Sequence, residues 1–145
     1  MDDLDRAILR CLLADGRATF HEIGRRVRLS PPAVKRRVDR MLARGEISHF
    51  TAVIDPGSLG WEVEAYVEIY YDGNVLKDEL ATSLAGIPQV VGVWNVSGDA
   101  DALVHVMAGS IAELEDTIEQ IRRTDRLQRT RSAIVLSRLF ERSLG

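Results

Sequence analysis

Residues 19–45, TFHEIGRRVRLSPPAVKRRVDRMLARG, contain the two helix starts that decide the fold of the N-terminal part of the chain. Thr19 is followed three residues later by Glu22, which predicts the capping box of one helix. Ser30 before Pro31 predicts the start of the next helix, because proline suits the first helical position. Only a short turn separates the two helices, so the stretch predicts a helix-turn-helix.

The second of these helices has an apolar face and a basic face. Apolar residues at helical spacing predict the side that packs inward, namely Val34, Val38, Met41 and Leu42. Arg36 and Arg40 fall on the opposite side, and Gly45 is placed to end the helix. Between Arg17 and Arg44 nine basic residues stand against two acidic ones. A solvated helical face usually mixes both signs, so this pattern indicates DNA binding.

Another helix is predicted before this motif, over residues 4–14, with a buried stripe of Leu4, Ile8, Cys11 and Leu12. Three aspartates stand at its start, where the helix dipole favours negative charge: Asp2, Asp3 and Asp5. Cys11 is the only cysteine, so no internal disulfide can form, and its position is typical of a small buried hydrophobe. Gly24, inside the following helix, predicts a close helix–helix approach.

The composition changes near residue 60, which predicts a domain boundary. Residues 47–54 alternate loosely and predict a short strand or wing after the third helix. The turn signal at residues 55–57 and the Leu59-Gly60 pair mark a linker. We therefore expect a winged helix-turn-helix domain over residues 1–53, a linker over 54–61 and a second domain over 62–145.

The second domain is predicted to alternate strands and helices in the order βαββαβ. The predicted strands span residues 63–71, 90–96, 102–107 and 130–139. One predicted helix spans residues 75–85, and the other follows a cap at Ser110 and ends at residue 123. This order is the ferredoxin-like plan, an α+β fold in which helices cover one face of an antiparallel sheet. The other face stays bare, and a bare face with tyrosines normally binds another subunit.

Length, composition and charge exclude several classes of protein. The 145 residues suffice for one domain or two small ones, and 46% of them are apolar. Residues 1–50 carry 11 basic and 7 acidic residues (net +4), whereas residues 51–145 carry 8 and 15 (net −7). Only the basic N-terminal part, residues 1–50, is therefore expected to bind a polyanion. The acidic start MDDLD argues against a signal peptide, and no apolar run approaches the ~20 residues of a membrane span. A cytoplasmic, nucleoid-associated protein is expected.

Together these segments resemble the Lrp/AsnC family of feast/famine transcription regulators over essentially the whole chain. The matching phrases are LDRAIL (4–9), DGRAT (15–19), LSPPAVKRRVDRM (29–41), GEI (45–47), IDPGSLG (54–60) and VSGDADALVHV (96–106). The resemblance implies an effector-sensing C-terminal domain that dimerises sheet to sheet, with dimers assembling further, often into octamer-like rings. It implies a free amino acid bound between dimers. It also implies that the third helix of each subunit enters the major groove of a pseudo-palindromic DNA site.

The expected DNA contacts lie on the third helix and the helix before it. Arg36 is assigned to base contact, because arginine binds guanine in a bidentate manner. Pro32 and Ala33 are expected to line the groove by apolar contact. Phosphate contacts are expected from Lys35, Arg37, Arg40, Arg25 and Arg26. Ser30, which caps the third helix, completes the DNA-binding set.

The expected effector site is a turn made of Gly98, Asp99, Ala100 and Asp101. Backbone N–H groups in such a turn can receive a carboxylate, and Asp101 can accept from an α-ammonium group. A plain hairpin turn would use the same residue types, so the assignment depends on the resemblance. The family commonly has bulky residues beside the second aspartate, where this chain has Ala100 and Ala102. The pocket is then either wider or inactive, and Trp94 is expected in the core or as a pocket wall.

Two other readings remain open from the sequence. Sirohaem decarboxylases resemble the same two-domain plan, but they have His and Arg where residues 92–106 contain only His105. No common catalytic motif is present, and neither a metal nor a cofactor is expected. The third reading is an architectural DNA-binding protein that senses nothing.

Overall fold

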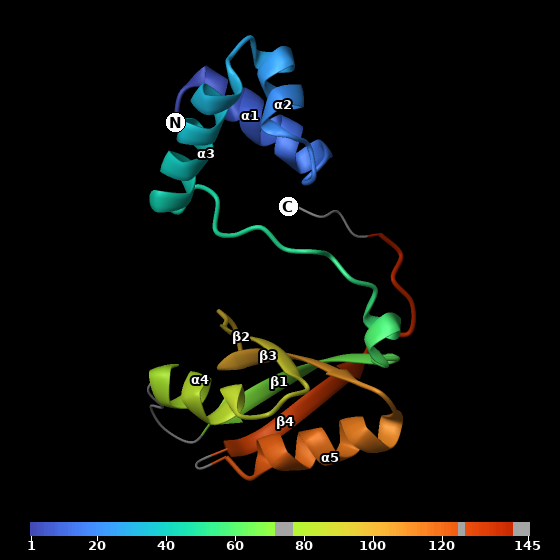
Figure 1. Ribbon diagram of the computed structural model, residues 1–145. Coiled ribbons are helices and arrows are strands. Elements are labelled where there is room, and N and C mark those ends of the chain that lie inside the picture. Colours follow the sequence, from blue (N-terminus) through green and yellow to red (C-terminus); the bar gives the residue numbers. More distant parts are fainter. Residues whose placement is uncertain (72–76, 125–126, 141–145) are drawn as a thin grey trace. The chain divides into compact units, whose positions relative to one another are not determined.

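The computed structural model describes residues 1–71, 77–124 and 127–140 (Figure 1). Contacts within the chain divide these residues into two compact units, residues 1–53 and residues 54–140. The first unit is helical, and the second contains a four-stranded sheet. Within the described ranges no helix is long and apolar enough to cross a membrane.

The first unit is built from α1 (Asp3–Ala14), α2 (Phe20–Val27) and α3 (Pro31–Ala43), which confirms the predicted helices. Its core is small and consists of Ile8, Ile23, Val34, Val38 and Met41. Leu4 and Leu42 were expected in that core, but they are 36% and 37% exposed. Each lies at the edge of its helix's apolar stripe, where the three-helix packing does not reach.

The turn between α2 and α3 is tight, and Gly24 makes it possible. The capping box of α2 forms as predicted, with the Thr19 N–H donating to Glu22 at 2.7 Å. A Cβ on Gly24 would lie 2.4 Å from the carbonyl oxygen of Leu29, so the close approach is to the turn and not to another helix. Arg28 adopts the left-handed conformation at φ 57°. Ser30 occupies the N-cap position of α3, although its side chain makes no capping hydrogen bond.

The chain leaves α3 through a Schellman motif. The Glu46 N–H donates to the Met41 carbonyl and the Gly45 N–H to the Leu42 carbonyl, with Gly45 at φ 71°. The wing predicted over residues 47–54 is absent, because this segment forms no strand in the structure as described. Phe50 and Val53 are 52% and 84% exposed, so no neighbouring strand covers the segment within its unit.

The second unit has the predicted order βαββαβ. Its elements are β1 (Val63–Tyr71), α4 (Lys77–Ala85), β2 (Val90–Asn95), β3 (Ala102–Ala108), α5 (Ile111–Arg122) and β4 (Leu127–Ile134). The strands lie in the order β2-β3-β1-β4, and every neighbouring pair is antiparallel. The predicted start of the first helix, at residues 75 and 76, lies outside the described residues. The last strand was expected to reach residue 139 but ends at Ile134, which pairs with Ala65 near the start of β1.

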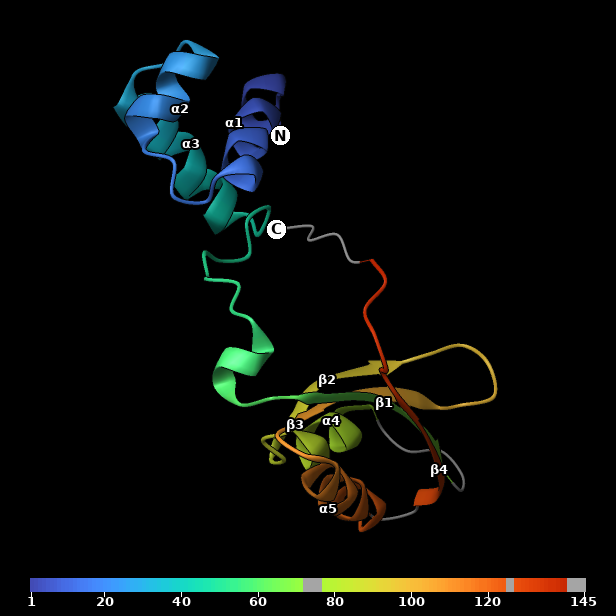
Figure 2. The same ribbon diagram turned by 90° about the vertical axis from the view of Figure 1, so that its right-hand side faces the viewer.

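Helices α4 and α5 lie on the same face of the sheet (Figures 1 and 2). Leu84 of α4 and Leu114 and Ile121 of α5 form one core with the inward residues of the sheet, which include Val67, Ile69, Val104 and Val106. Ile111 is 51% exposed, because it lies at the very start of α5. Among the described residues of this unit, no helix lies on the opposite face of the sheet (Figure 1).

Part of the predicted linker packs with the second unit. Asp55 caps a short 3-10 helix, η1 (Pro56–Leu59), by accepting from the Ser58 N–H. The Glu62 N–H then donates to the Ala108 carbonyl at 3.0 Å, which joins the chain to the end of β3. The chain therefore enters the sheet along a defined path.

Candidate functional site

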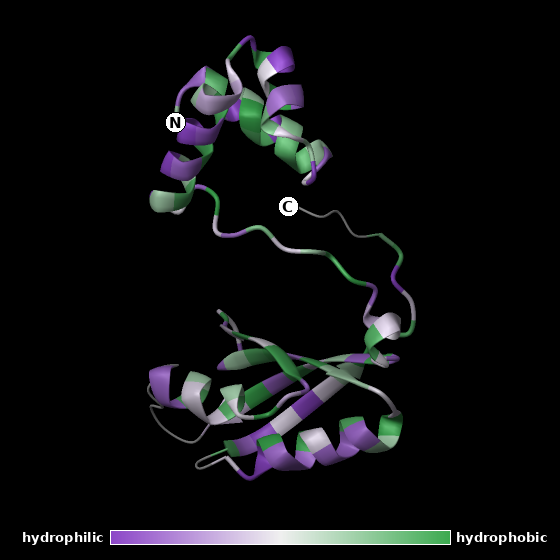
Figure 3. Cartoon of the chain, in the orientation of Figure 1, coloured by the Kyte–Doolittle hydropathy of each residue, from purple (hydrophilic) through white to green (hydrophobic). Residues whose placement is uncertain are grey.

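The outer face of α3 is the candidate nucleic-acid interface. Hydrophilic bands mark this helix in Figure 3. Arg36 is exposed, and among the described residues its guanidinium makes no hydrogen bond or ion pair. Pro32 is also exposed, and Ala33 is half-buried, so both lie near the start of the same helix as expected. This placement leaves Arg36 free to contact another molecule.

Two arginines of α3 are instead bound by the start of α1. The Arg37 guanidinium donates to Asp5 and to Asp2, each at 2.7 Å. Arg40 donates to both carboxylate oxygens of Asp5 at 3.0 Å. The Asp5 side chain is 2% exposed, which makes it the buried centre of the cluster. The helix dipole alone does not account for these aspartates: Asp2 caps α1 and Asp5 lies three residues on, so both face the same side.

The electrostatics of this cluster favour its charged form. Hydrogen bonds from Arg37 and from the Asp5 N–H lower the pKa of Asp2 to about 2. Burial opposes ionisation of Asp5, but hydrogen bonds from the Asp2 N–H and Arg37 still lower the pKa of its carboxyl. The same contacts with Asp2 and Asp5 raise the pKa of Arg37. Two carboxylates and two guanidiniums therefore neutralise one another between α1 and α3.

The other predicted phosphate contacts differ in how free they are. Lys35 is paired with Asp39 one turn later, at 2.6 Å. Arg25 and Arg26 of α2 are exposed, and within the described ranges neither makes a hydrogen bond or ion pair. Ser30 is exposed beside them in the turn. The structure thus brings the predicted residues onto one unit but leaves only some of their charges uncompensated.

The candidate effector turn connects β2 to β3 and projects beyond the sheet (Figure 2). Gly98 has φ 126°, a conformation that glycine adopts readily. Asp99 is exposed, whereas Ala100 is 8% exposed and Ala102 is fully buried in the core. The two alanines therefore point inward instead of lining an open cavity.

Asp101 is tied to the neighbouring strand. Its carboxylate accepts from the Tyr71 N–H at 2.8 Å, and its own N–H donates to the Ile69 carbonyl at 2.9 Å. Burial and the charge of Asp101 raise the pKa of Tyr71 to about 12, and the buried Tyr71 hydroxyl finds no partner among the described residues. Asp101 thus anchors the turn to β1, a role that the sequence analysis did not foresee.

The uncovered face of the sheet carries an aromatic group at its centre. Tyr66 of β1 stacks on His105 of β3 with ring centroids 4.6 Å apart, and Trp94 of β2 lies 6.3 Å from the same ring. Trp94 is 48% exposed, so it belongs neither to the core nor to a closed pocket. Its ring covers Gly92, where a Cβ would lie 2.4 Å from the indole. Tyr66 of β1 therefore lies on the bare face of the sheet.

Charged pairs flank these rings. Glu64 contacts His105 at 2.7 Å and Arg138 at 2.8 Å, while Glu68 pairs with Arg131 at 3.2 Å. Burial opposes ionisation of Glu64, but the contacts with Arg138 and His105 lower the pKa of its carboxyl. The Arg129 guanidinium lies 4.1 Å above the Tyr70 ring. An apolar centre with a charged rim is the usual composition of a protein interface.

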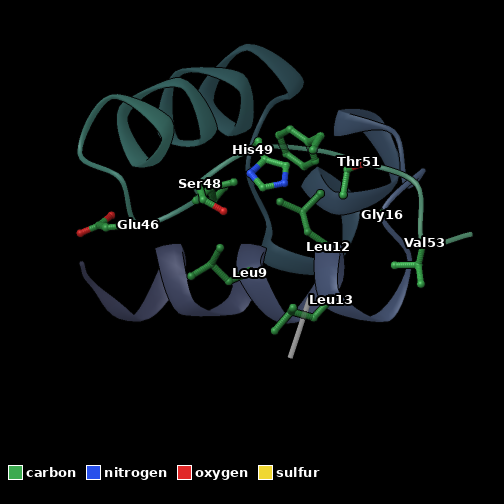
Figure 4. A pocket seen from close by; sticks show the side chains of 11 residues that line it. Leu9, Leu12, Leu13, Gly16, Glu46, Ser48, His49, Thr51 and Val53 are labelled. Atoms are coloured by element: carbon green, nitrogen blue, oxygen red, sulfur yellow. The ribbon is translucent and has the colours of Figure 1, made fainter. Parts of the chain in front are cut away.

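A separate cavity of about 260 Å³ lies in the first unit, between α1 and the segment after α3 (Figure 4). Leu9, Leu12 and Leu13 line it from α1, and residues 46–51 and Val53 line it from the segment. It is mostly apolar and is not lined by α3. Within the described part of the chain no cluster of side chains is arranged to hold a metal ion.

Comparison with known proteins identifies both units. Residues 1–42 match the AsnC-type helix-turn-helix domain, and residues 64–144 match the Lrp/AsnC ligand binding domain. The HTH-type transcriptional regulator Rv2324 of Mycobacterium tuberculosis is 47% identical over 142 residues, which cover 98% of this chain and 96% of that protein. LrpA of the same organism is 36% identical over 97% of this chain and 93% of its own length. These relatives are named as regulators, not enzymes, which confirms the non-enzymatic interpretation.

Solved structures give the same result. Escherichia coli AsnC superposes with a TM-score of 0.89 at 27% identity, covering 99% of this chain and 97% of that one. A feast or famine regulatory protein from M. tuberculosis, complexed with L-methionine, superposes with a TM-score of 0.88 at 36% identity, covering 97% and 95%. Both units and their order along the chain are shared with these proteins. The chain therefore belongs to the Lrp/AsnC family of transcriptional regulators, with a DNA-binding helix-turn-helix domain and a ligand-binding domain.

Proposed function

We propose that this regulator binds a pseudo-palindromic DNA site as a homodimer or a larger assembly of dimers, and that an amino acid changes its assembly or its DNA affinity. The observation that carries the DNA-binding part is Arg36, exposed on the outer face of α3. Its guanidinium is not paired within the described chain, so both donor edges are available to a guanine base. We infer a cytoplasmic, nucleoid-associated protein, since its partner is DNA.

The remaining DNA contacts follow from their position around Arg36. Pro32 and Ala33 present apolar surface to the groove, while Arg25, Arg26 and Ser30 hold phosphates. Lys35, Arg37 and Arg40 stay in the proposed set, but each must leave an intramolecular ion pair before it can bind a phosphate. Arg36 is therefore the contact with the largest expected effect on sequence discrimination.

Dimerisation is proposed to use the uncovered sheet face. The group formed by Tyr66, His105 and Trp94 gives that face an apolar centre, and a second copy would remove it from water. Dimeric helix-turn-helix proteins bind half-sites about one helical turn apart, so pairing of the sheets would supply the two-fold symmetry that such a site requires. Further assembly of dimers is proposed from the family resemblance.

The effector is proposed to be an amino acid that binds at the turn formed by residues 98–101. A 36% identical relative was crystallised with L-methionine, which supports an amino acid as the ligand class. Backbone N–H groups near Gly98 would receive its carboxylate. The Asp101 carboxylate would accept from its ammonium group while still holding the Tyr71 N–H. Because Ala100 and Ala102 point inward, the walls of the pocket would come from a neighbouring copy.

The DNA-binding role is tested by selecting duplexes from a random-sequence library with the protein and then comparing variants by mobility shift. Arg36→Ala should lose about 1–3 kcal/mol of discrimination, the range for one bidentate arginine–guanine contact. Arg6→Ala is the matched control, because Arg6 is an exposed arginine of the same unit that pairs with Asp3. Equal discrimination by both variants would contradict the base-contact role.

The effector role is tested by a thermal-shift screen of the twenty amino acids, with particle size measured for every hit. Asp101→Ala should abolish the response to a hit without abolishing DNA binding. A protein that binds DNA but responds to no amino acid would be the architectural protein instead of the regulator proposed here.

A further inference from the structure

Most of the positively charged side chains on α3 are paired with carboxylates, which the sequence alone does not suggest. The helix carries Lys35, Arg36, Arg37 and Arg40, yet three of these four cations are engaged by carboxylates of the same unit. Lys35–Asp39 is an exposed pair within the helix, of a kind that is weak in water. The pairs made by Arg37 and Arg40 are different, because they connect α3 to a carboxylate that is only 2% exposed.

The geometry restrains both guanidiniums. Asp5 accepts from Arg37 through one oxygen and from Arg40 through both, and Asp2 accepts from Arg37 at a second carboxylate. The Asp2 and Asp5 side chains also exchange hydrogen bonds with each other's backbone N–H groups, at 2.8 and 3.1 Å. Because these carboxylates belong to the first turn of α1, they cannot follow the arginines outward without unwinding that turn.

We propose that Asp2 and Asp5 act as specificity residues of the DNA-binding head, by holding Arg37 and Arg40 away from DNA phosphates. The proposal rests on the DNA-binding function proposed above. Sequence-independent affinity grows with the number of phosphates that a protein neutralises, whereas base contacts supply discrimination. Two restrained arginines therefore reduce binding to every sequence, and the contribution of Arg36 becomes a larger share of the total.

The two aspartates have separable roles. Asp5 positions both arginines from inside the unit, so its removal would take away the one buried carboxylate that joins α1 to α3 and would endanger the fold. The Asp2 side chain is 53% exposed and, of the two arginines, contacts Arg37 only. Asp2 is also the N-cap of α1, and asparagine caps helices as well as aspartate does. Asp2→Asn therefore removes one of the two carboxylate charges that hold Arg37, the one nearer to solvent, and keeps the helix cap.

The chain offers a matched control one residue away. Asp3→Asn makes the same change in net charge on the same turn of α1, but Asp3 is 97% exposed and pairs with Arg6, not with α3. The experiment measures binding of the full-length protein and both variants to a mixed-sequence duplex, and to a duplex selected by the wild type, at several salt concentrations. Asp2→Asn should steepen the slope of log affinity against log salt by up to about 0.9, the value for one complete additional phosphate contact, because Asp5 still competes for Arg37. It should also lower the ratio of selected to mixed-sequence affinity.

The outcomes separate this inference from the function on which it rests. If the wild type prefers no sequence, the proposed function fails. If the wild type discriminates but Asp2→Asn and Asp3→Asn share its salt slope, the restraint by Asp2 is refuted and the function stands. In the double variant D2N/R37Q the increase in slope over the wild type should disappear, because the released arginine is gone. A steep slope in that double variant would assign the gain to a residue other than Arg37 and overturn the proposal.

Discussion

In the helical head the buried carboxylate of Asp5 finds its partners within the same unit, whereas no described helix of the sheet unit covers the face around Tyr66 and Trp94. The head closes a five-residue core and neutralises most of the charge on α3 by itself. The sheet unit closes a larger core on one side only. Each unit therefore closes its own core, and the contrast supports the proposal that subunits assemble through the sheet unit.

Two positions on β1, which point to opposite faces of the sheet, test this difference with the largest expected effect. Ile69 is fully buried against the helices, so Ile69→Ala should cost about 2–5 kcal/mol of unfolding free energy, the usual range for a core isoleucine. Tyr66 points to the other face and is 36% exposed. Tyr66→Ala should leave the subunit folded and shift the protein toward monomers. Circular dichroism melts and sedimentation velocity measure the two effects.

Two results for Tyr66→Ala would contradict this contrast between the two faces of β1. If Tyr66→Ala unfolded the subunit as severely as Ile69→Ala, the uncovered face would be part of the subunit's own stability. If it left the oligomer unchanged, the assembly would use another surface. Glu115→Ala on α5, an exposed residue on the opposite side of the sheet, is the control for the oligomer measurement.

A smaller effect is expected from adding one methyl group to a glycine in each unit. Gly24→Ala would place a Cβ 2.4 Å from the Leu29 carbonyl oxygen, and overpacking of this kind typically costs about 1–3 kcal/mol. DNA binding should weaken as well, because the strained turn positions α3. Gly86→Ala in the sheet unit meets no atom within 4 Å and should be tolerated. Thermal unfolding and a mobility shift of both variants check this contrast. Unchanged stability and DNA affinity in Gly24→Ala would contradict it.

Sequence patterns predicted the helices and strands of both units well, because these patterns depend on residues close together in the chain. Helical spacing of Val34, Val38 and Met41 and the capping box at Thr19 are properties of short stretches, and the structure confirms them. The order βαββαβ followed for the same reason. The wing failed because alternation over residues 47–54 indicates extended backbone but cannot supply a neighbouring strand.

The site was predicted less completely, because its contacts join distant residues. Arg37 and Arg40 were assigned from their charge and their place on α3, while their partners are more than 30 residues earlier in the chain. The anchoring of Asp101 to Tyr71 likewise joins two strands that only the sheet register brings together. The exposure of Trp94 depended on which face of β2 the helices cover, and a single strand does not specify this.

The smallest predicted effect concerns acid stability of the head. The pKa of Asp2 falls from an ordinary 3.8 to about 2 in the folded protein, so its ionised form stabilises the fold. That contribution is complete above about pH 4 and is lost as the pH falls from 3.8 toward 2. Asp2→Asn should therefore weaken the acid dependence of amide exchange in α1 relative to the wild type. Amides in α5 should respond alike in both proteins, because Asp2 belongs to the other unit; a difference there would mean that the two units are coupled.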